Sequence, residues 1–186
     1  MVKLSPRLDA VASLVRDNTA FADIGCDHGF LTVYLLTQGK IRCAVAADIN
    51  EGPLSRCREL VHAYSLQSKV KCVLCDGLEK ISPNDAQDIA VCGMGGEMIA
   101  HILQSCEWIK NRDKHFIFNP MTHPEKLREF LCKNGFEIAK DMIVRDGDHF
   151  YSVFDAYYTG RVSTPPEWFY YIGKIDDFSG RAYFER

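Results

Sequence analysis

The segment DIGCDHG at positions 23–29 has the clearest chemical potential in the chain. A dinucleotide-binding loop has the pattern GxGxxG, whose glycines make room for a pyrophosphate at a helix N-terminus. Here Asp27 occupies the second glycine position, and Asp23 ends the preceding apolar run. Two carboxylates in a partly buried site would repel a pyrophosphate by about a few kcal/mol, whereas they suit an ammonium or sulfonium centre. The loop therefore favours S-adenosylmethionine as ligand, and a tight turn capped by Asp27 is the alternative.

Two further acids end later apolar runs. Asp48 follows the run IRCAVAA, and a carboxylate at such a position can accept both hydroxyls of an adenosine ribose. The alternative for Asp48 is the N-cap of the following helix, a role that Asn50 or Glu51 could fill instead. Asp76 forms an Asp-Gly pair with Gly77, and it either accepts a hydrogen bond from the adenine amino group or belongs to an ordinary turn.

A glycine-rich segment, GMGG at 93–96, follows another apolar run. Three glycines in four residues serve a tight turn or a close backbone approach to a ligand, and the position after a strand favours the ligand. Met94 either packs against a substrate base or plugs the loop. Asn119 precedes Pro120, and it either orients a substrate edge or forms a turn. Asp27, Met94 and Asn119 are the catalytic candidates, with Asp27 as an acid that could stabilise a cationic product.

The elements that must position these segments alternate between strands and helices. Continuous apolar runs predict strands at 19–25, 41–48, 69–75, 88–93, 114–120, 136–144 and 149–158, and helical periods predict helices at 3–17, 28–38, 51–66, 95–106 and 124–135. Ser5 is predicted to cap the first helix, and Phe30 to lie on the apolar face of the second. The order predicts an α/β fold of the Rossmann-like type, with five parallel strands and an antiparallel C-terminal hairpin. Ligands bind such sheets outside the carboxyl ends of the strands, where these loops would meet.

Composition agrees with one compact domain in the cytoplasm. The chain has 186 residues, 47% of them apolar, and a formal net charge of −3. These values exclude a disordered or fibrous chain, and no apolar stretch approaches the ~20 residues of a membrane span. Pro6, Arg7 and Asp9 interrupt any apolar core of a signal peptide. The charge does not favour nucleic acid, but a local basic rim can suffice.

The eight cysteines are predicted to be reduced and mostly buried, because no secretory signal accompanies them. Cys72 and Cys75 have CxxC spacing, but no second ligand pair for zinc follows at a suitable distance. The sequence therefore predicts no metal site.

Together the motifs resemble the bacterial tRNA adenine-N1 methyltransferases that act on position 22, a class I S-adenosylmethionine-dependent family. The matching segments are LSPRL (4–8), ADIGCDHGFL (22–31), AADINEGPL (46–54), DGL (76–78), CGMGGEMIAHIL (92–103), NPMTHPEKLREFL (119–131) and DGDHFYSVF (146–154). The resemblance implies an enzyme that makes N1-methyladenosine in tRNA, with S-adenosylmethionine as cofactor and tRNA as partner.

The candidate site residues form two groups. The candidates for cofactor binding are Asp23, Gly25, Cys26, Asp27, His28, Asp48, Ile49, Asp76, Gly77, Gly93, Met94 and Gly95. The candidates for RNA contact are Lys3, Arg7, Lys126 and Arg128, as a basic rim around the pocket; each residue of these types is more often a solvated surface charge. His28 either touches the substrate or lies in the first turn of a helix.

The chain is predicted to divide into a methyltransferase domain at 1–160 and an aromatic-rich tail at 161–186. Members of the family often continue into a C-terminal coiled-coil domain, and the tail has no heptad pattern for one. The aromatic residues at 168–171 either stack on RNA bases or pack at the edge of the sheet.

Other functions compete with tRNA methylation. A methyltransferase could act on another RNA, a protein or a small molecule, and a noncatalytic module could bind adenosine or RNA. A nicotinamide dehydrogenase is disfavoured because the loop lacks its second glycine and carries two acids. A monomer and a weak dimer are both compatible with the sequence.

Overall fold

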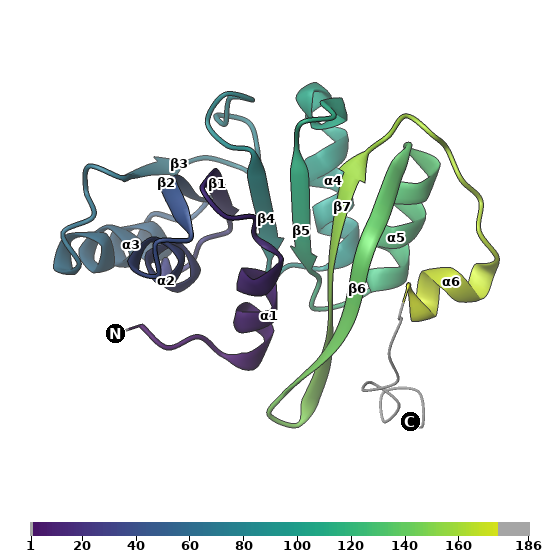
Figure 1. Ribbon diagram of the computed structural model, residues 1–186, viewed down its shortest axis with the longest axis horizontal. Helices are drawn as coiled ribbons and strands as arrows, with labels where there is room; N and C mark the ends of the chain where they lie inside the picture. Colours follow the sequence, from purple (N-terminus) through teal and green to yellow (C-terminus); the bar gives the residue numbers. More distant parts are fainter. Residues whose placement is uncertain (1, 175–186) are drawn as a thin grey trace.

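Seven strands form one mixed sheet in the order β3-β2-β1-β4-β5-β7-β6 in the computed structural model, which describes residues 2–174 (Figure 1). The strands are β1 (Thr19–Ile24), β2 (Ile41–Asp48), β3 (Val70–Leu74), β4 (Asp88–Cys92), β5 (His115–Asn119), β6 (Phe136–Asp146) and β7 (His149–Tyr158). β1 to β5 are parallel, and β7 pairs antiparallel with both β5 and β6. The predicted α/β fold with a C-terminal antiparallel hairpin is confirmed.

Helices cover both faces of this sheet. They are α1 (Pro6–Leu14), α2 (Phe30–Thr37), α3 (Glu51–Ala63), α4 (Gly96–Gln104), α5 (Pro124–Lys133) and α6 (Glu167–Ile172), with a 3-10 turn η1 (Glu107–Lys110). One apolar cluster joins α1, α2 and α3 to the sheet through residues such as Val11, Leu35 and Leu54. The second joins α4 and α5 to the other face through residues such as Ile99 and Leu127. Two-sided coverage explains why the parallel strands are continuous apolar runs.

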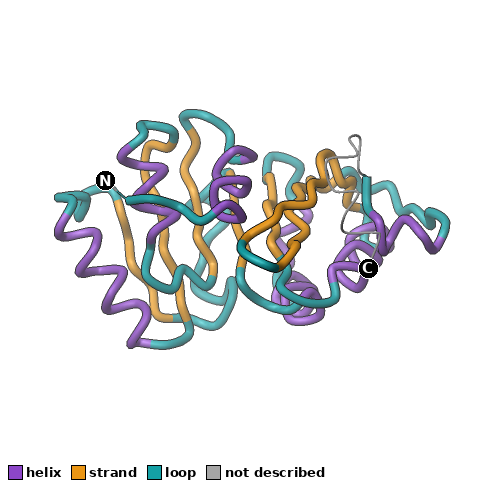
Figure 2. The backbone as a smooth tube through the Cα atoms, turned by 90° about the horizontal axis from the view of Figure 1, so that it is seen from below, coloured by secondary structure: helices purple, strands orange, loops and turns teal. Residues whose placement is uncertain are grey.

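The winding of the chain reverses at the centre of the sheet, between β1 and β4. From β1 the chain proceeds through β2 to β3 at one edge, and from β4 it proceeds through β5 toward the other. The loops after β1 and β4 therefore lead to helices on opposite faces. Such a reversal leaves a crevice outside the carboxyl ends of the strands. In Figure 1 α1 and the tip of the β6–β7 hairpin lie at this end, and Figure 2 views the hairpin tip from below.

The element boundaries differ from the prediction mainly at helix ends. α1 begins at Pro6 rather than at residue 3, and Ser5 occupies its N-cap position without a capping hydrogen bond. Its buried hydroxyl has no hydrogen-bond partner within residues 2–174. η1 and α6 were not predicted, since elements of four and six residues are too short to show a helical period.

A buried charged cluster ties the amino ends of β4 and β5 to β7, at the end of the sheet away from the crevice. His115 Nε2 lies 2.8 Å from Asp155 Oδ2, and its Nδ1 lies 3.3 Å from Asp88 Oδ2. Arg16 Nη2 donates to Asp88 Oδ1 at 2.6 Å. Burial lowers the pKa of His115, but the hydrogen bonds to Asp155 and Asp88 outweigh it and raise the pKa above its ordinary value. The cluster is structural, because it lies at the opposite end of the strands from the crevice.

The segment after β7 runs back along α5. Thr159 N donates to Gly135 O at 2.9 Å, and Ser163 N donates to Cys132 O at 3.0 Å. This path brings α6 against α5. The predicted division at residue 160 stays a prediction, and positions 175–186 of the predicted tail lie outside the described residues. No helix within residues 2–174 has the length and apolar character to cross a membrane.

Candidate functional site

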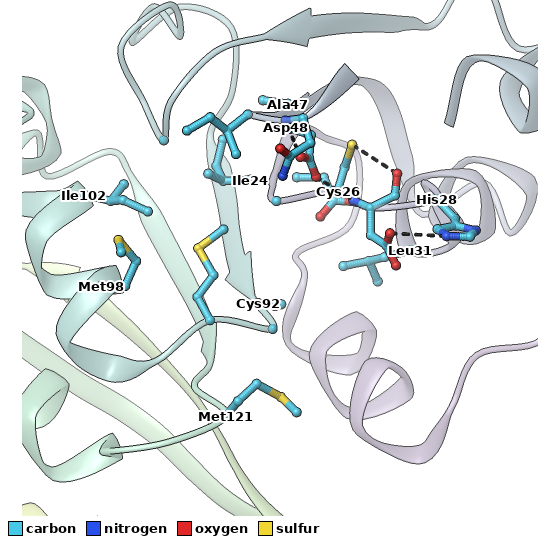
Figure 3. A pocket seen from close by; sticks show the side chains of 18 of the residues that line it. Ile24, Cys26, His28, Leu31, Ala47, Asp48, Cys92, Met98, Ile102 and Met121 are labelled. Carbon is cyan, nitrogen blue, oxygen red and sulfur yellow. Dashed lines mark hydrogen bonds and ion pairs between the residues drawn. The ribbon is translucent and has the colours of Figure 1, made fainter. Parts of the chain in front are cut away.

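A cavity of about 550 Å³ opens at the carboxyl ends of β1, β2 and β4 (Figure 3). Eleven of the predicted cofactor-binding residues line it, namely Asp23, Gly25, Cys26, Asp27, His28, Asp48, Ile49, Asp76, Gly77, Gly93 and Met94. In Figure 3 Met98 and Ile102 of α4 lie on one side, and Asp48 and Cys26 lie on the other. Four segments far apart in the sequence thus meet at one cavity, as the fold prediction required.

The loop after β1 is held against β2 by backbone hydrogen bonds. The amides of Gly25 and Cys26 both donate to the Ala47 carbonyl oxygen, at 2.8 and 2.9 Å. Gly25 has φ +73°, in the left-handed region that favours glycine. Gly29 has φ +74°, and a Cβ there would lie 2.5 Å from Cys57 Sγ on α3. The glycines therefore allow a tight turn and close packing, and the turn presents Asp27 to the cavity.

Asp23 forms the buried acidic floor of the cavity. It is 4% exposed, and Thr32 Oγ1 donates to its Oδ2 at 2.7 Å. Burial raises the pKa of Asp23 to about 6; the bond from Thr32 opposes this rise, and the charges of Asp48 and Asp27 add to it. A positively charged ligand in the cavity would favour the ionised form and bind to it.

Asp48 ends β2 with its carboxylate between two loops. Its Oδ2 accepts the amide of Asp27 at 3.2 Å, and its Oδ1 accepts the amide of Asn50 at 2.9 Å. α3 has Asn50 as N-cap residue and no side-chain capping bond, so Asp48 does not cap that helix. Each carboxylate oxygen keeps a lone pair for a ligand hydroxyl.

Asp76 is exposed at the cavity edge, beside Gly77 with φ +47°.

The GMGG segment serves two purposes. Gly93 has φ +78°, and no atom lies within 4 Å of the Cβ position, so its backbone borders open space. Gly96 packs against the next loop, since a Cβ there would lie 2.1 Å from the His123 carbonyl oxygen. Gly95 pairs with Thr122 and is not among the residues that line the cavity, so its assignment to cofactor binding stays a prediction. Met94 lines the cavity and crosses to β1, with its methyl 2.3 Å from the Cβ position of Gly25.

Asn119 does not line the cavity, contrary to the prediction of a catalytic amide. Its side chain is fully buried, and both of its polar atoms have protein partners. Arg7 Nη1 donates to Asn119 Oδ1 at 3.0 Å, and Asn119 Nδ2 donates to the Ser152 carbonyl oxygen at 3.1 Å. Asn119 therefore joins α1 to β7 instead of contacting a substrate. Asp27 and Met94 are the two catalytic candidates that the cavity wall contains.

Arg128 is not part of a basic rim, which is a second correction. It is 0% exposed, and its Nε and Nη2 donate to the two carboxylate oxygens of Asp141 at 2.8 and 2.9 Å. Its Nη2 also donates to Ser152 Oγ at 3.1 Å, and its Nη1 donates to the carbonyl oxygens of Tyr170 at 2.9 Å and Tyr171 at 3.3 Å. Arg128 therefore connects α5, the hairpin and α6.

The other predicted RNA contacts have different surroundings. Lys3 and Lys126 are exposed. Arg7 lines the cavity with its side chain 26% exposed. The aromatic residues of α6 also differ in exposure. Trp168 is 57% and Tyr171 is 56% exposed, whereas Phe169 packs against the core.

Sequence reasoning missed the apolar part of the cavity wall. Phe30 was predicted to face the core but is 44% exposed at the cavity, stacked on His28 with 5.5 Å between ring centroids. Met98 and Met121 also line the cavity and are 54% and 38% exposed. Helical spacing alone does not distinguish such residues from core residues. The signal that could have found Phe30 and Met98 was their position, just after loops that carry acids and glycines, whereas Met121 follows Asn119 and Pro120.

The cysteines within residues 2–174 are free thiols, as predicted. Cys75 is buried at the cavity wall, and Cys72 is half-buried at the surface of β3, where its thiol contacts that of Cys57. No group of three or more His, Cys, Asp or Glu side chains in the described part of the chain is arranged to hold a metal ion.

The chain was compared with known proteins. Residues 4–154 match the methyltransferase domain family. The crystal structure of the Bacillus subtilis m1A22 tRNA methyltransferase TrmK superposes with a TM-score of 0.82 at 32% identity, covering 87% of this chain and 69% of that one. The chain belongs to the tRNA (m1A22) methyltransferase family. The family resemblance inferred from the sequence motifs is therefore confirmed.

A sequence match and a second solved structure extend the comparison. The curated tRNA (adenine(22)-N(1))-methyltransferase of Bacillus subtilis is 33% identical over 152 residues, which are 82% of this chain. The chain spans 64% of the length of that relative. The structure of M. capricolum TrmK in complex with S-adenosylhomocysteine has a TM-score of 0.85 at 27% identity, covering 98% of this chain and 82% of that one.

Proposed function

We propose that this chain transfers a methyl group from S-adenosylmethionine to N1 of an adenine in tRNA, at the position numbered 22 in the names of its relatives. The observation that carries the proposal is the cavity at the switch point, where Asp23, Asp27 and Asp48 meet the open backbone of Gly93. The family and the S-adenosylhomocysteine complex of its M. capricolum member support this use of the cavity.

The residues present fit S-adenosylmethionine. Asp48 offers carboxylate lone pairs to ribose hydroxyls, and Asp76 offers an acceptor at the cavity edge for the adenine amino group. Asp23 and Asp27 place negative charge where an ammonium and a sulfonium would be attracted. Gly93 leaves its side of the cavity clear of side-chain atoms. A pyrophosphate would instead meet three acids at close range.

The chemistry demands positioning more than proton transfer. When bound, S-adenosylmethionine supplies an electrophilic methyl group on a sulfonium sulfur. Adenine N1 carries its own lone pair, so the chain needs no strong base and acts by aligning the base and excluding water. N1 lies on the Watson–Crick edge, so the adenine must be unpaired and inserted into the cavity. Phe30, Met98 and Met121 give the base an apolar surface, and the Asp27 carboxylate, 70% exposed, can stabilise the cationic product.

The tRNA must reach the opening of the cavity although the chain, with a net charge of −3, carries the same sign of charge as the RNA. Lys3 and Lys126 are exposed and can contact phosphates, whereas Arg128 is removed from that group by its burial. Exposed Trp168 and Tyr171 offer stacking surfaces on α6. An enzyme acting on tRNA works in the cytoplasm, which is the compartment that the sequence predicts.

The test is methyl transfer to a defined RNA. The purified chain is incubated with labelled S-adenosylmethionine and an unmodified tRNA transcript with adenine at position 22, and the nucleosides are separated. Label in N1-methyladenosine is expected, and it is expected to vanish with a matched transcript that has guanine at position 22. Label in another nucleoside, or equal label in both transcripts, would refute the site of methylation. S-adenosylhomocysteine binding without transfer to any RNA would point to a protein or small-molecule substrate.

A further inference from the structure

Three cysteine side chains connect the wall of the cavity with the surface of β3. Cys26 is buried in the cavity wall (Figure 3), Cys57 is 0% exposed on α3, and Cys72 is half-buried on β3. The Cys57 thiol has two side-chain hydrogen-bond partners of its own kind, the thiols of Cys26 and Cys72. We call these three residues the thiol cluster. Its central member therefore has one neighbour at the cavity and one neighbour that solvent can reach.

Cys57 also supports the loop that follows β1. A Cβ at Gly29 would lie 2.5 Å from Cys57 Sγ and 3.2 Å from Cys57 Cβ, so the end of the loop packs directly on this cysteine. The Gly29 amide donates to the Cys26 carbonyl oxygen at 2.8 Å, and the Asp27 amide donates to Asp48 Oδ2 at 3.2 Å. The position of Cys57 Sγ is thus linked through the loop backbone to the acids of the cavity.

The thiols of Cys57 and Cys72 are protonated in the reduced protein. The hydrogen bond with Cys26 and burial raise the pKa of Cys57, and the hydrogen bond with Cys57 and burial raise the pKa of Cys72. Protonated thiols are poor nucleophiles, so the pair needs a strong oxidant to react. An oxidant reaches Cys72 first, because the other two thiols of the cluster are buried. The exposed Arg58 on α3 opposes the rise in the pKa of Cys72 and thereby favours its thiolate.

We propose that Cys57 and Cys72 form a reversible disulfide that links oxidation at the surface to the cofactor cavity. The Cys72 thiolate attacks a hydroperoxide and becomes a sulfenic acid; the O–O bond breaks, and the departing alkoxide, or hydroxide from hydrogen peroxide, takes the proton that Cys72 released. The Cys57 sulfur then attacks the sulfenic sulfur, the S–O bond breaks, and the departing hydroxide leaves as water with the Cys57 proton. Two thiols are oxidised to one disulfide, one hydroperoxide is reduced, and a dithiol reverses the bond by exchange. Transient disulfides of this kind are the ones that occur in reducing compartments.

The disulfide moves Cys57 away from the loop. A disulfide holds its two sulfurs at about 2.05 Å, closer than two thiols in contact, so Cys57 Sγ shifts toward β3. Cys26 and Gly29 then lose the side chain on which they pack, and the loop that carries Asp27 loosens. The bond itself does not depend on the proposed function, whereas its effect on ligand binding rests on the proposed cofactor.

The test treats the purified full chain with hydrogen peroxide, blocks the remaining thiols and analyses the peptides by mass spectrometry without reduction. A peptide pair that joins Cys57 to Cys72 is expected, and it is expected to disappear after treatment with dithiothreitol. Calorimetry on the same samples should show S-adenosylhomocysteine binding about 10-fold weaker after oxidation and restored after reduction, because the loop is misplaced. Hydrogen exchange at the amides of residues 25–29, a measurement that needs no ligand, should rise on oxidation.

Two serine variants serve as controls. In Cys72→Ser, which removes the accessible member of the pair, peroxide is expected to change neither the affinity nor the hydrogen exchange of the loop. Cys43→Ser removes an exposed thiol outside the thiol cluster, and it should respond to peroxide like the unsubstituted chain.

The opposite results are equally specific. Oxidation of Cys72 to a sulfinic acid without a joined peptide pair, or a bond between Cys26 and Cys57 instead, would overturn the proposed disulfide. A Cys57–Cys72 bond with unchanged loop exchange and unchanged affinity would overturn its link to the cavity, and so would an equal response to peroxide in Cys72→Ser. If the reduced chain does not bind S-adenosylhomocysteine at all, the proposed cofactor is wrong, while the joined peptides and the loop exchange still decide the inference about the disulfide.

Discussion

Replacing Asp48 by asparagine removes one charge from the cavity while preserving the shape of the side chain. In the structure the Asp48 carboxylate is 8% exposed, and each oxygen accepts one backbone amide, from Asp27 and from Asn50. An asparagine can accept only one of these two amides. The second amide then faces an NH2 group, and one buried hydrogen bond is lost, at a cost of about 1 kcal/mol in the free energy of unfolding.

The effect of Asp48→Asn on cofactor binding is expected to be larger. A ribose bound at Asp48 makes charge-assisted hydrogen bonds, each worth about 1.5–3 kcal/mol, and the neutral amide keeps one weaker bond. The dissociation constant of S-adenosylhomocysteine, measured by calorimetry, should rise about 10- to 100-fold. Asp17→Asn, an exposed carboxylate before β1 and outside the cavity, controls for net charge. A folded Asp48→Asn protein with unchanged affinity would show that Asp48 only organises the two loops, and the assignment to ribose would fail.

Three further expectations concern stability and metal content. Arg128→Met should lower the free energy of unfolding in urea by about 3–5 kcal/mol, because it leaves the Asp141 carboxylate buried without its partner. Adding Asp141→Leu should recover part of that loss, and strictly additive costs would contradict the pairing. The pKa of His115 is raised in the folded state, so its imidazolium adds stability that is fully present below its unfolded pKa of about 6.5 and is lost as the pH rises through the folded value. The difference in unfolding free energy between the protein and His115→Gln should therefore shrink above about pH 6.5, and a difference independent of pH would refute this charge state. Elemental analysis of the purified protein should find no stoichiometric zinc, and Cys72→Ser/Cys75→Ser should retain activity; one zinc per chain would overturn this interpretation of the CxxC pair.

The position of the cavity could be predicted because it depends on local patterns and on one topological rule. Continuous apolar runs located the strands, and strand–helix alternation made the sheet parallel, so the loops after successive strands had to share an edge. The sequence therefore predicted, without any measured distance, that the acids and glycines of those loops lie close together. The sequence did not indicate the neighbours of Gly95 and Asn119, because loop and strand-end residues can point toward the next element instead of the cavity. Only the packed structure shows Gly95 against Thr122 and Asn119 between Arg7 and β7.

Arg128 and Phe30 were both misplaced for the same physical reason. Residue type predicts an arginine outside and a phenylalanine inside, since burial of a charge is costly and burial of an aromatic ring is favourable. Arg128 reverses this rule because all three of its guanidinium nitrogens find acceptors, and the partners come from the hairpin and α6, which no local pattern connects to α5. Phe30 departs from it because it is the first residue of α2, and α2 begins at the cavity. Its side chain therefore lines the cavity instead of packing into the core. The exposed ring of Phe30 leaves apolar surface at the cavity that the planar face of a ligand could cover. Phe30 thus belongs to the cavity wall, whereas Arg128 belongs to the packing of α5, the hairpin and α6.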